Sequence, residues 1–173
     1  IDKKLTYLYR KYFPKLNGFH AVSKAIAKEA QKYGIDPQVI RVIPPSVCYK
    51  LLEINAYKKN DKITNQDILH IISIGRCHWV KGYTIALDAM LLLKIKGVKF
   101  HYTIIASGDD KENILYQIKD MGLDESITFI NGMSHRNVID KLQKSDLFLL
   151  PSFEEGISNA VLEAMALGIP VIS

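Results

Sequence analysis

From residue 68 to the end of the chain, short apolar segments alternate with longer segments whose apolar residues recur at helical spacing. The short segments are apolar throughout rather than at alternate positions, which indicates strands buried on both faces. Strands of that kind belong to parallel sheets, because the crossover helices of βαβ units cover both faces. The pattern therefore predicts an α/β fold, a Rossmann-like parallel sheet with helices on both faces and right-handed crossovers.

The bounds of the predicted elements follow from apolar spacing and from glycine and proline stops. Strands are predicted at 68–75, 100–106, 127–130 and 147–150, with another starting at Val171, and helices at 83–96, 111–121, 137–144 and 159–167. Ligands of such sheets bind beyond the carboxyl ends of the strands. We therefore expect the functional residues in the loops that follow Ile74, Ala106, Ile130 and Leu150.

The first part of the chain has a different organisation. Residues 18–33 predict a short strand and then a helix that Ser23 caps, and residues 40–43 predict another strand. The apolar stripe of that helix is predicted to consist of Ala25, Ile26, Ala30 and Tyr33.

Two prolines and a polar stretch then predict a linker. We expect three parts, namely the tail of one domain at 1–43, a linker at 44–67 and a second domain at 68–173. The chain starts at an isoleucine and stops within a predicted strand, so we expect a fragment of a longer protein.

Composition narrows the class of protein. Hydrophobic residues make up 48% of the 173 residues, and no apolar run approaches the roughly 20 residues of a membrane-spanning helix. No signal peptide is expected at the N-terminus. Cys48 and Cys77 have no partner motif, so we expect two buried or half-buried thiols and a cytoplasmic location.

The net charge of +5 is concentrated in lysines and arginines among the first 32 residues. These residues form either a solvated basic face, which we favour, or a contact with the anionic inner face of the plasma membrane. No nucleic-acid-binding motif accompanies the charge, so no nucleic-acid partner is expected.

The segment after Leu150 carries the most specific chemistry. Glu155 and Glu163 are separated by seven residues, and the sequence GISN between them leads into a helix. The first amides of a helix lack intrahelical partners and lie at its positive end, which suits a diphosphate. Glu163 lies about one turn further, roughly 6 Å along the axis, where a carboxylate can accept hydrogen bonds from ribose hydroxyls.

The alternative for the same segment is two ordinary surface carboxylates. The composition of the helix opposes it, because nearly every other residue in 159–167 is apolar and an apolar helix is expected to be buried. A lone carboxylate in such a helix, here Glu163, requires a partner or a ligand.

The segment GRCHWVKG places Arg76 and Lys81 between Gly75 and Gly82 at the predicted carboxyl edge of the sheet. Two cations on one loop suit a diphosphate, although for any single pair of cations a solvated surface position is the favoured interpretation. Within the same segment Trp79 is either a packing residue, which we favour, or a wall of the site, and His78 is a candidate contact.

Gly132 and Met133 follow the strand predicted at 127–130. Glycine allows backbone groups to approach a nucleobase closely, or it simply forms a tight turn before the next helix. The sequence contains no G-x-G-x-x-G, P-loop, Asp-x-Asp or nucleophile motif, so no metal and no cofactor is expected.

Three segments in this order resemble the retaining GT-B glycosyltransferases of family 4, the glycosyl transferases group 1. HAVSKAIAKEAQKYGI with IRVIPPSV resembles the crossover into the donor domain, SIGRCHWVKG resembles the diphosphate loop, and SFEEGISNAVLEAMALGIPVIS resembles the E-x7-E segment. Three departures stand beside these similarities: IPPSV replaces I-P-N-G-V, ASG replaces G-x-G, and EGISN replaces E-G-F-G-L-P. The resemblance implies that residues 68–173 are part of the C-terminal donor domain of a GT-B fold.

The resemblance also implies roles. It assigns donor binding and catalysis to Arg76, Lys81 and Glu155, and the ribose contact to Glu163. The other implied substrate-binding residues are Gly75, Gly132, Met133, Gly156, Ile157, Ser158 and Asn159.

The implied activity is transfer of a hexosyl group with retention from a UDP- or GDP-sugar to a glycan or lipid-linked acceptor, in cell-surface polysaccharide biosynthesis. Two alternatives stay open: a donor-binding module without turnover, and a GT-B sugar-nucleotide epimerase.

Overall fold

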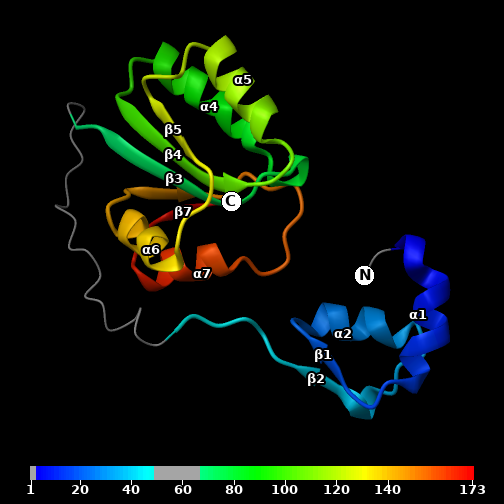
Figure 1. Cartoon of the computed structure of the whole chain (residues 1–173). Helices are drawn as coiled ribbons and strands as arrows, with labels where there is room; N and C mark the ends of the chain where they lie inside the picture. The colour runs from blue at the N-terminus through cyan, green and yellow to red at the C-terminus, as the bar shows by residue number, and fades with distance from the viewer. Residues whose placement is uncertain (1–2, 49–66) are drawn as a thin grey trace. The chain divides into compact units, whose positions relative to one another are not determined.

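The computed structural model describes residues 3–48 and 67–173 (Figure 1). The chain divides into two compact units, Ile1–Ser46 and Val47–Ser173. Most of the linker predicted at 44–67 lies outside the described residues.

The larger unit is built on one parallel sheet with the strand order β5-β4-β3-β6-β7. Its strands are β3 (Leu69–Arg76), β4 (Phe100–Ser107), β5 (Ile127–Ile130), β6 (Leu147–Leu149) and β7 (Val171–Ile172). All strands run in one direction, so their carboxyl ends meet at one edge of the sheet, as the alternation predicted.

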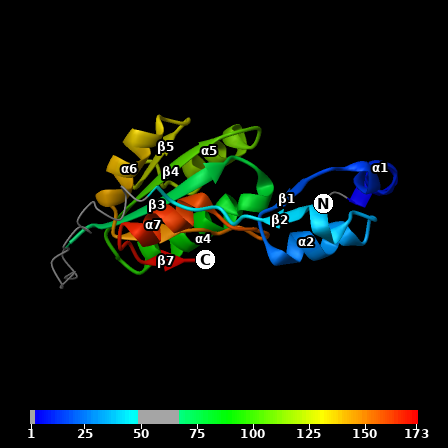
Figure 2. The same ribbon diagram turned by 90° about the horizontal axis from the view of Figure 1, so that it is seen from below.

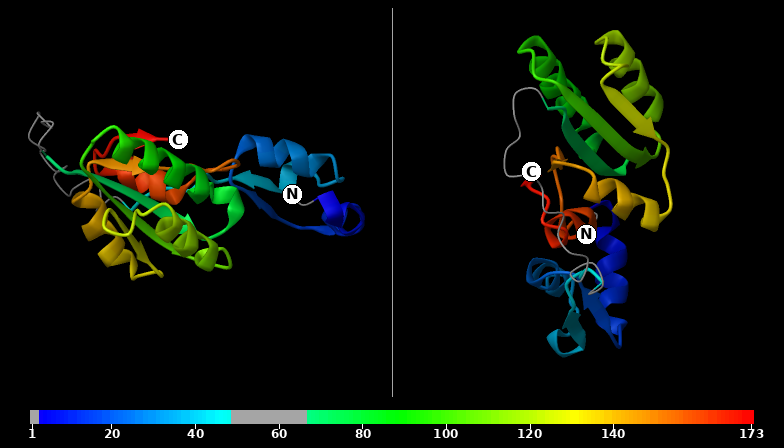
Figure 3. Two further views of the ribbon diagram at one scale, coloured as in Figure 1. Left: turned by 90° about the horizontal axis from the view of Figure 1, so that it is seen from above. Right: turned by 90° about the vertical axis from the view of Figure 1, so that its left-hand side faces the viewer.

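Helices cover both faces of this sheet. They are α4 (Tyr83–Ile95), α5 (Lys111–Asp120), α6 (His135–Gln143) and α7 (Asn159–Ala166). The first two pack against one face in a core that includes Ile71, Tyr102 and Ile104, and the last two pack against the other in a core that includes Ile72 and Phe148. Figures 2 and 3 show the two helix layers from other sides. The predicted α/β fold is confirmed.

The order of the strands creates a switch point beside β3. The chain builds β3, β4 and β5 outward in one direction and then returns to place β6 on the opposite side of β3. The chain therefore continues from the loop after β3 to α4 on one face of the sheet, and from the loop after β6 to α7 on the other face. In open α/β sheets the crevice between two such loops is where ligands bind.

A buried polar chain crosses the centre of this sheet. The Tyr102 hydroxyl donates to Ser73 Oγ at 2.8 Å, and Ser73 Oγ donates to the Leu149 carbonyl at 2.5 Å. The chain joins β4, β3 and the end of β6, and burial raises the pKa of Tyr102 above its ordinary value. Each hydroxyl thus has a partner, which burial of polar groups requires.

Two predicted starts differ from the structure by one or two residues. β3 begins at Leu69 and leaves Ile68 exposed, and α6 begins at His135 rather than at residue 137. The earlier start of α6 follows from Ser134, whose hydroxyl accepts a hydrogen bond from the Asn137 amide and caps the helix.

The prediction that the last helix is buried all round is wrong. Within α7 only Ala164 is fully buried, and Met165 is 62% exposed. The helix packs against the sheet along one side only, so its apolar composition does not translate into burial of every face.

The smaller unit contains two parallel strands, β1 (Phe19–Ala21) and β2 (Ile40–Val42), and α2 (Lys24–Gln31). Ser23 caps α2 by accepting from the Ile26 amide at 3.2 Å, as predicted. The predicted stripe was wrong at Ala25, which is exposed, whereas Ala27 and Ala30 are buried. The stripe lies at Ala27 because this residue is one turn from Ala30 on the same face.

No helix is predicted from the sequence at α1 (Thr6–Tyr12), which follows the 3-10 turn Lys3–Leu5 and precedes the turn Phe13–Lys15. Tertiary contacts of aromatic rings hold this short helix. The Tyr9 ring lies 4.9 Å from that of Phe13 and 5.5 Å from that of Tyr33, which comes after α2.

We predict that Ser73→Ala destabilises the larger unit more than Tyr102→Phe does. The serine change leaves both the Tyr102 hydroxyl and the Leu149 carbonyl without their partner, at a cost of about 2 kcal/mol, whereas the tyrosine change removes one hydrogen bond, at about 1 kcal/mol. Urea unfolding at constant m-value measures both. Equal midpoints for the two variants would contradict the role of Ser73 as the central link.

Candidate functional site

Backbone contacts hold the two loops at the switch point together. The Phe153 amide in the loop after β6 donates to the Val80 carbonyl in the loop after β3, at 2.9 Å. Gly82, with a φ of 64°, packs so closely on Pro151 that a Cβ would lie 2.0 Å from the Pro151 carbonyl oxygen. No side chain fits at position 82, so glycine sets the distance between the loops.

Lys81 and Glu155, predicted from separate motifs, form an ion pair across these two loops. Their side chains are 14% and 27% exposed, and Ser152 Oγ donates to the same carboxylate at 3.3 Å. Partial burial on its own raises the pKa of Glu155, but hydrogen bonds from Lys81, Ser152 and the Gly156 amide outweigh it and hold the pKa below its ordinary value. The carboxylate is therefore ionised at neutral pH.

Gly75 places the Lys81 side chain over the end of β3. A Cβ at position 75 would lie 3.1 Å from the Tyr83 hydroxyl and 3.7 Å from Lys81 Cε, so both side chains lie against its backbone. Arg76, the last residue of β3, is exposed, and within the described residues no ion pair is recorded for it. Of the two predicted cations, the structure thus brings Lys81 to Glu155 and leaves Arg76 at the rim.

A pocket of about 340 Å³ lies at the N-terminal end of α7. Ser158 caps the helix by accepting from the Val161 amide at 3.5 Å, and the three residues preceding this cap are exposed. The pocket is lined by Leu150, Ser152, Glu155, Gly156, Ile157, Ser158, Val161, Leu162 and Ser173. It therefore combines the positive end of a helix with the predicted sugar-facing carboxylate. Asn159, the first residue of the helix, is exposed beside it.

Glu163 is not a lone carboxylate. Its Oε1 accepts a hydrogen bond from His135 Nε2 at 2.8 Å, and its side chain is 16% exposed. His135 begins α6, 28 residues earlier in the sequence. The sequence offered a signal for this histidine in the segment NGMSHRN, which we interpreted only through the backbone of Gly132 and Met133.

Gly132 adopts a left-handed conformation with a φ of 70°, and its amide donates to the Ile130 carbonyl at 2.9 Å. This geometry fits the tight turn before α6. Met133 is half-buried and packs against the core beneath α6 and α7. The nucleobase contact of these two residues stays a prediction.

The packing role favoured for Trp79 is wrong. Its side chain is 67% exposed and lies beside Phe153, which is 58% exposed, with the ring centroids 6.2 Å apart. The buried positions of this loop belong to Cys77 and Gly82 instead. The expected burial of the thiols is confirmed for Cys77, whose pKa is raised by burial, and is wrong for Cys48, which is exposed.

Within residues 3–48 and 67–173, no group of three or more histidine, cysteine or acidic side chains is placed to hold a metal ion. Among the same described residues, no helix is long and apolar enough to cross a membrane.

A family model described as Glycosyl transferases group 1 matches residues 55–173, more than half of the chain. The chain belongs to this family. The group 1 chain is 36% identical over 111 residues to the amylovoran biosynthesis glycosyltransferase AmsK of Erwinia amylovora. This alignment covers 61% of the group 1 chain and 27% of AmsK. The chain is 29% identical over 133 residues to the O-antigen biosynthesis glycosyltransferase WclY of Escherichia coli, over 67% of this chain and 37% of that protein. The chain thus spans between 27% and 37% of the length of these relatives.

Solved structures share the fold. HepE of Anabaena, in complex with UDP and glucose, matches 99% of this group 1 chain and 48% of its own, with a TM-score of 0.76 and 17% identity. The C-terminal domain of a group 1 family protein, LpcC of Francisella tularensis, matches 60% of this chain and 56% of its own, with a TM-score of 0.53 and 26% identity.

We predict that Gly82→Ala destabilises the group 1 chain by about 2 kcal/mol or more, because it adds a backbone clash with Pro151 to the cost of a left-handed alanine. Gly97→Ala is the matched control, since Gly97 has a similar φ of 72° but nothing within 4 Å of its Cβ position. Denaturant unfolding compares the two variants. Equal losses of stability would show that the contact between the loops is unimportant.

The lowered pKa of Glu155 predicts how the ion pair depends on pH. A carboxyl group whose pKa is lower in the folded state stabilises that state above its unfolded pKa, about 4.3, and loses this contribution as pH falls through the folded value. The stability difference between the unmodified chain and Lys81→Met should therefore be full at pH 7 and shrink below about pH 4. The exposed Lys119→Met is the control. A difference that is independent of pH would contradict the assignment.

Proposed function

We propose that the chain is the donor-binding part of a retaining glycosyltransferase of family 4. It binds a nucleotide-sugar, either a UDP- or a GDP-sugar, whose hexosyl group is transferred to a glycan or lipid-linked acceptor in cell-surface polysaccharide biosynthesis. The observation that carries the proposal is the Lys81–Glu155 pair at the switch point, beside the pocket at the start of α7. The names of AmsK and WclY, and the UDP and glucose bound to HepE, support it.

The donor diphosphate lies between the cationic loop and the first amides of α7. An ammonium group has three donors, so Lys81 can keep its bond to Glu155 and offer two more to phosphate oxygens. Arg76 reaches the same diphosphate from the rim as a planar fork. These groups stabilise the charge that grows on the departing nucleoside diphosphate, and no metal ion is required by the proposal.

The sugar and the ribose lie on opposite sides of the diphosphate. Glu155, held by Lys81, accepts hydrogen bonds from the transferred sugar, and the exposed residues Gly156 and Ile157 line the same side. Glu163 accepts from the ribose hydroxyls while His135 holds its other side. Glu163 lies within the first two turns of α7, so one short helix spans both contacts.

The proposed transfer proceeds on one face of the sugar. The bond between the anomeric carbon and the phosphate oxygen breaks while the acceptor oxygen bonds to the same face. The acceptor's proton passes to an oxygen of the leaving phosphate. We place the reaction in the cytoplasm. As the alternative to a solvated basic face, the basic residues within the first 32 would contact the anionic inner face of the plasma membrane.

Nucleotide binding tests the proposed site. Arg76→Ala and Glu163→Gln are each expected to weaken binding of the preferred nucleoside diphosphate about tenfold or more, because each removes a charge-assisted hydrogen bond worth roughly 1.5–3 kcal/mol. Isothermal calorimetry with UDP and with GDP measures the effect and identifies the base. Lys119→Ala, an exposed cation on α5, is the control.

A 2′-deoxynucleotide distinguishes the proposed ribose contact of Glu163 from the proposed diphosphate contact of Arg76. The 2′-deoxynucleotide should bind more weakly than the ribonucleotide to the unmodified chain, and Glu163→Gln should reduce that difference while Arg76→Ala preserves it. Unchanged affinity in both variants would overturn the site. Analysis of the product formed by the whole protein separates sugar transfer from epimerisation, and the absence of any product separates both from a binding module without turnover.

A further inference from the structure

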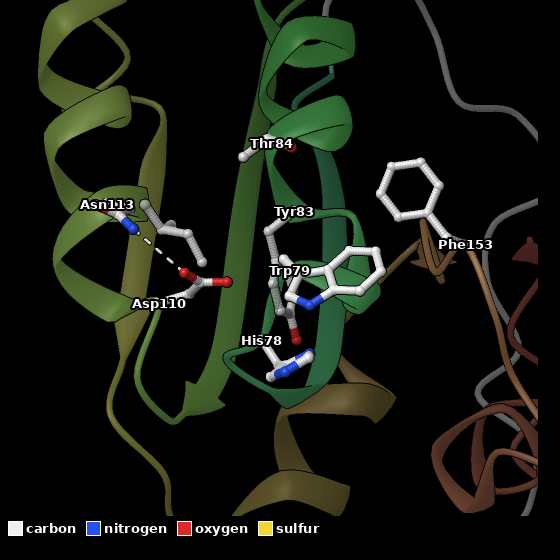
Figure 4. Close-up of a pocket in the computed structure, with 8 residues that line it drawn as sticks. His78, Trp79, Tyr83, Thr84, Asp110, Asn113 and Phe153 are labelled. Carbon is white, nitrogen blue, oxygen red and sulfur yellow. Dashed lines mark hydrogen bonds between the residues drawn. The ribbon is translucent and has the colours of Figure 1, made fainter. Parts of the chain in front are cut away.

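A second pocket, of about 190 Å³, lies between the N-terminal ends of α4 and α5 (Figure 4). It is lined by His78, Trp79, Tyr83, Thr84, Asp110, Asn113, Ile114 and Phe153. None of these residues belongs to the proposed donor site. The pocket nevertheless shares loops with it, since Trp79 precedes Lys81 by two residues and Phe153 precedes Glu155 by two.

Three aromatic side chains form the apolar part of this pocket. Trp79 and Phe153 are largely exposed, although large apolar side chains usually avoid water, and Tyr83 is buried with its ring against the pocket. A pair of exposed rings that is rimmed by polar groups is typical of a binding surface. Flat rings of this kind provide large contact areas at little conformational cost.

The polar part of the pocket offers both hydrogen-bond donors and acceptors. Asn113 Nδ2 donates to Asp110 Oδ1 at 3.2 Å, which fixes both side chains beside the rings (Figure 4). The Val80 amide donates to His78 Nδ1 at 3.4 Å, so Nδ1 acts as an acceptor and Nε2 carries a proton that it can donate to a ligand. The Thr84 hydroxyl can both donate and accept a hydrogen bond.

The charges of the side chains that line the pocket indicate which class of ligand it can bind. No lysine or arginine lines this pocket, and Asp110 is its carboxylate, so phosphates and acidic ligands are disfavoured. Flat apolar faces combined with short-range donors and acceptors suit a neutral ring that carries several hydroxyl groups. A pyranose has this character, because its ring hydrogens present an apolar face and its hydroxyls a polar edge.

We propose that the pocket of Trp79, Phe153, Asp110 and Asn113 binds a neutral sugar residue of the glycan acceptor or product. The inference rests on the proposed function, and it deepens that function by placing a glycan subsite beside the donor site. Phe153 and Val80 are joined by a backbone hydrogen bond, so the loops that carry the pocket's rings are those that carry Lys81 and Glu155. The subsite therefore keeps the glycan next to the site of transfer.

Trp79 makes this proposal directly measurable, because it is the only tryptophan in the sequence. The probes are neutral gluco- and galacto-oligosaccharides of two to six residues, titrated into the purified protein while tryptophan emission is recorded. We expect a saturable change in emission. Asn113→Ala and Phe153→Ala should each weaken the apparent affinity about tenfold, whereas Tyr116→Ala, an exposed aromatic on α5 outside the pocket, should not change it.

Other outcomes overturn the proposal. The proposal is wrong if tryptophan emission does not change with any oligosaccharide. It is also wrong if Phe153→Ala binds the oligosaccharides as tightly as the unmodified protein does. A saturable response to choline in place of the sugars would assign the pocket to a cationic ligand. A response to UDP alone that oligosaccharides do not reproduce would assign the pocket to the donor. Calorimetry with UDP on the same preparation tests the donor site separately, so a failure of the glycan subsite is distinguishable from a failure of the proposed function.

Discussion

The close contact between the loops that follow β3 and β6 determines the geometry of the candidate site. Gly82 lies against the Pro151 carbonyl with no room for a Cβ, and the Val80 carbonyl accepts a hydrogen bond from the Phe153 amide. These contacts are between backbone groups, which rotate less than side chains do. They hold the two loops at a fixed separation at the sheet's switch point, where ligand-binding crevices form in open α/β folds.

One pair of loops thereby presents two chemically different surfaces. Toward the crevice it carries the Lys81–Glu155 ion pair, which suits a charged diphosphate and the hydroxyls of a sugar. In the neighbouring pocket it carries Trp79 and Phe153, two exposed rings beside Thr84, Asn113 and the carboxylate of Asp110. A change in the contact between the loops would move both surfaces together, which couples the proposed donor and glycan sites mechanically.

Much of the fold could be predicted from the sequence, because strand and helix spacing, caps and glycine stops are local properties. The strand at Ile127–Ile130 and the Ser23 cap are examples. The failures have a common cause. Ala25, Met165 and Trp79 were each assigned burial or exposure from local composition, and burial depends on which neighbours the chain brings from elsewhere.

The sequence by itself determined the fold class, the family and the residue types available at the carboxyl edge of the sheet. It identified Lys81, Glu155 and Glu163 as candidates but not their partners. Only the tertiary structure decided that Lys81 pairs with Glu155, 74 residues away, and that Glu163 is held by His135. The physical reason is that strand order is set by long-range packing of βαβ units, and it is this order that brings distant loops to one edge.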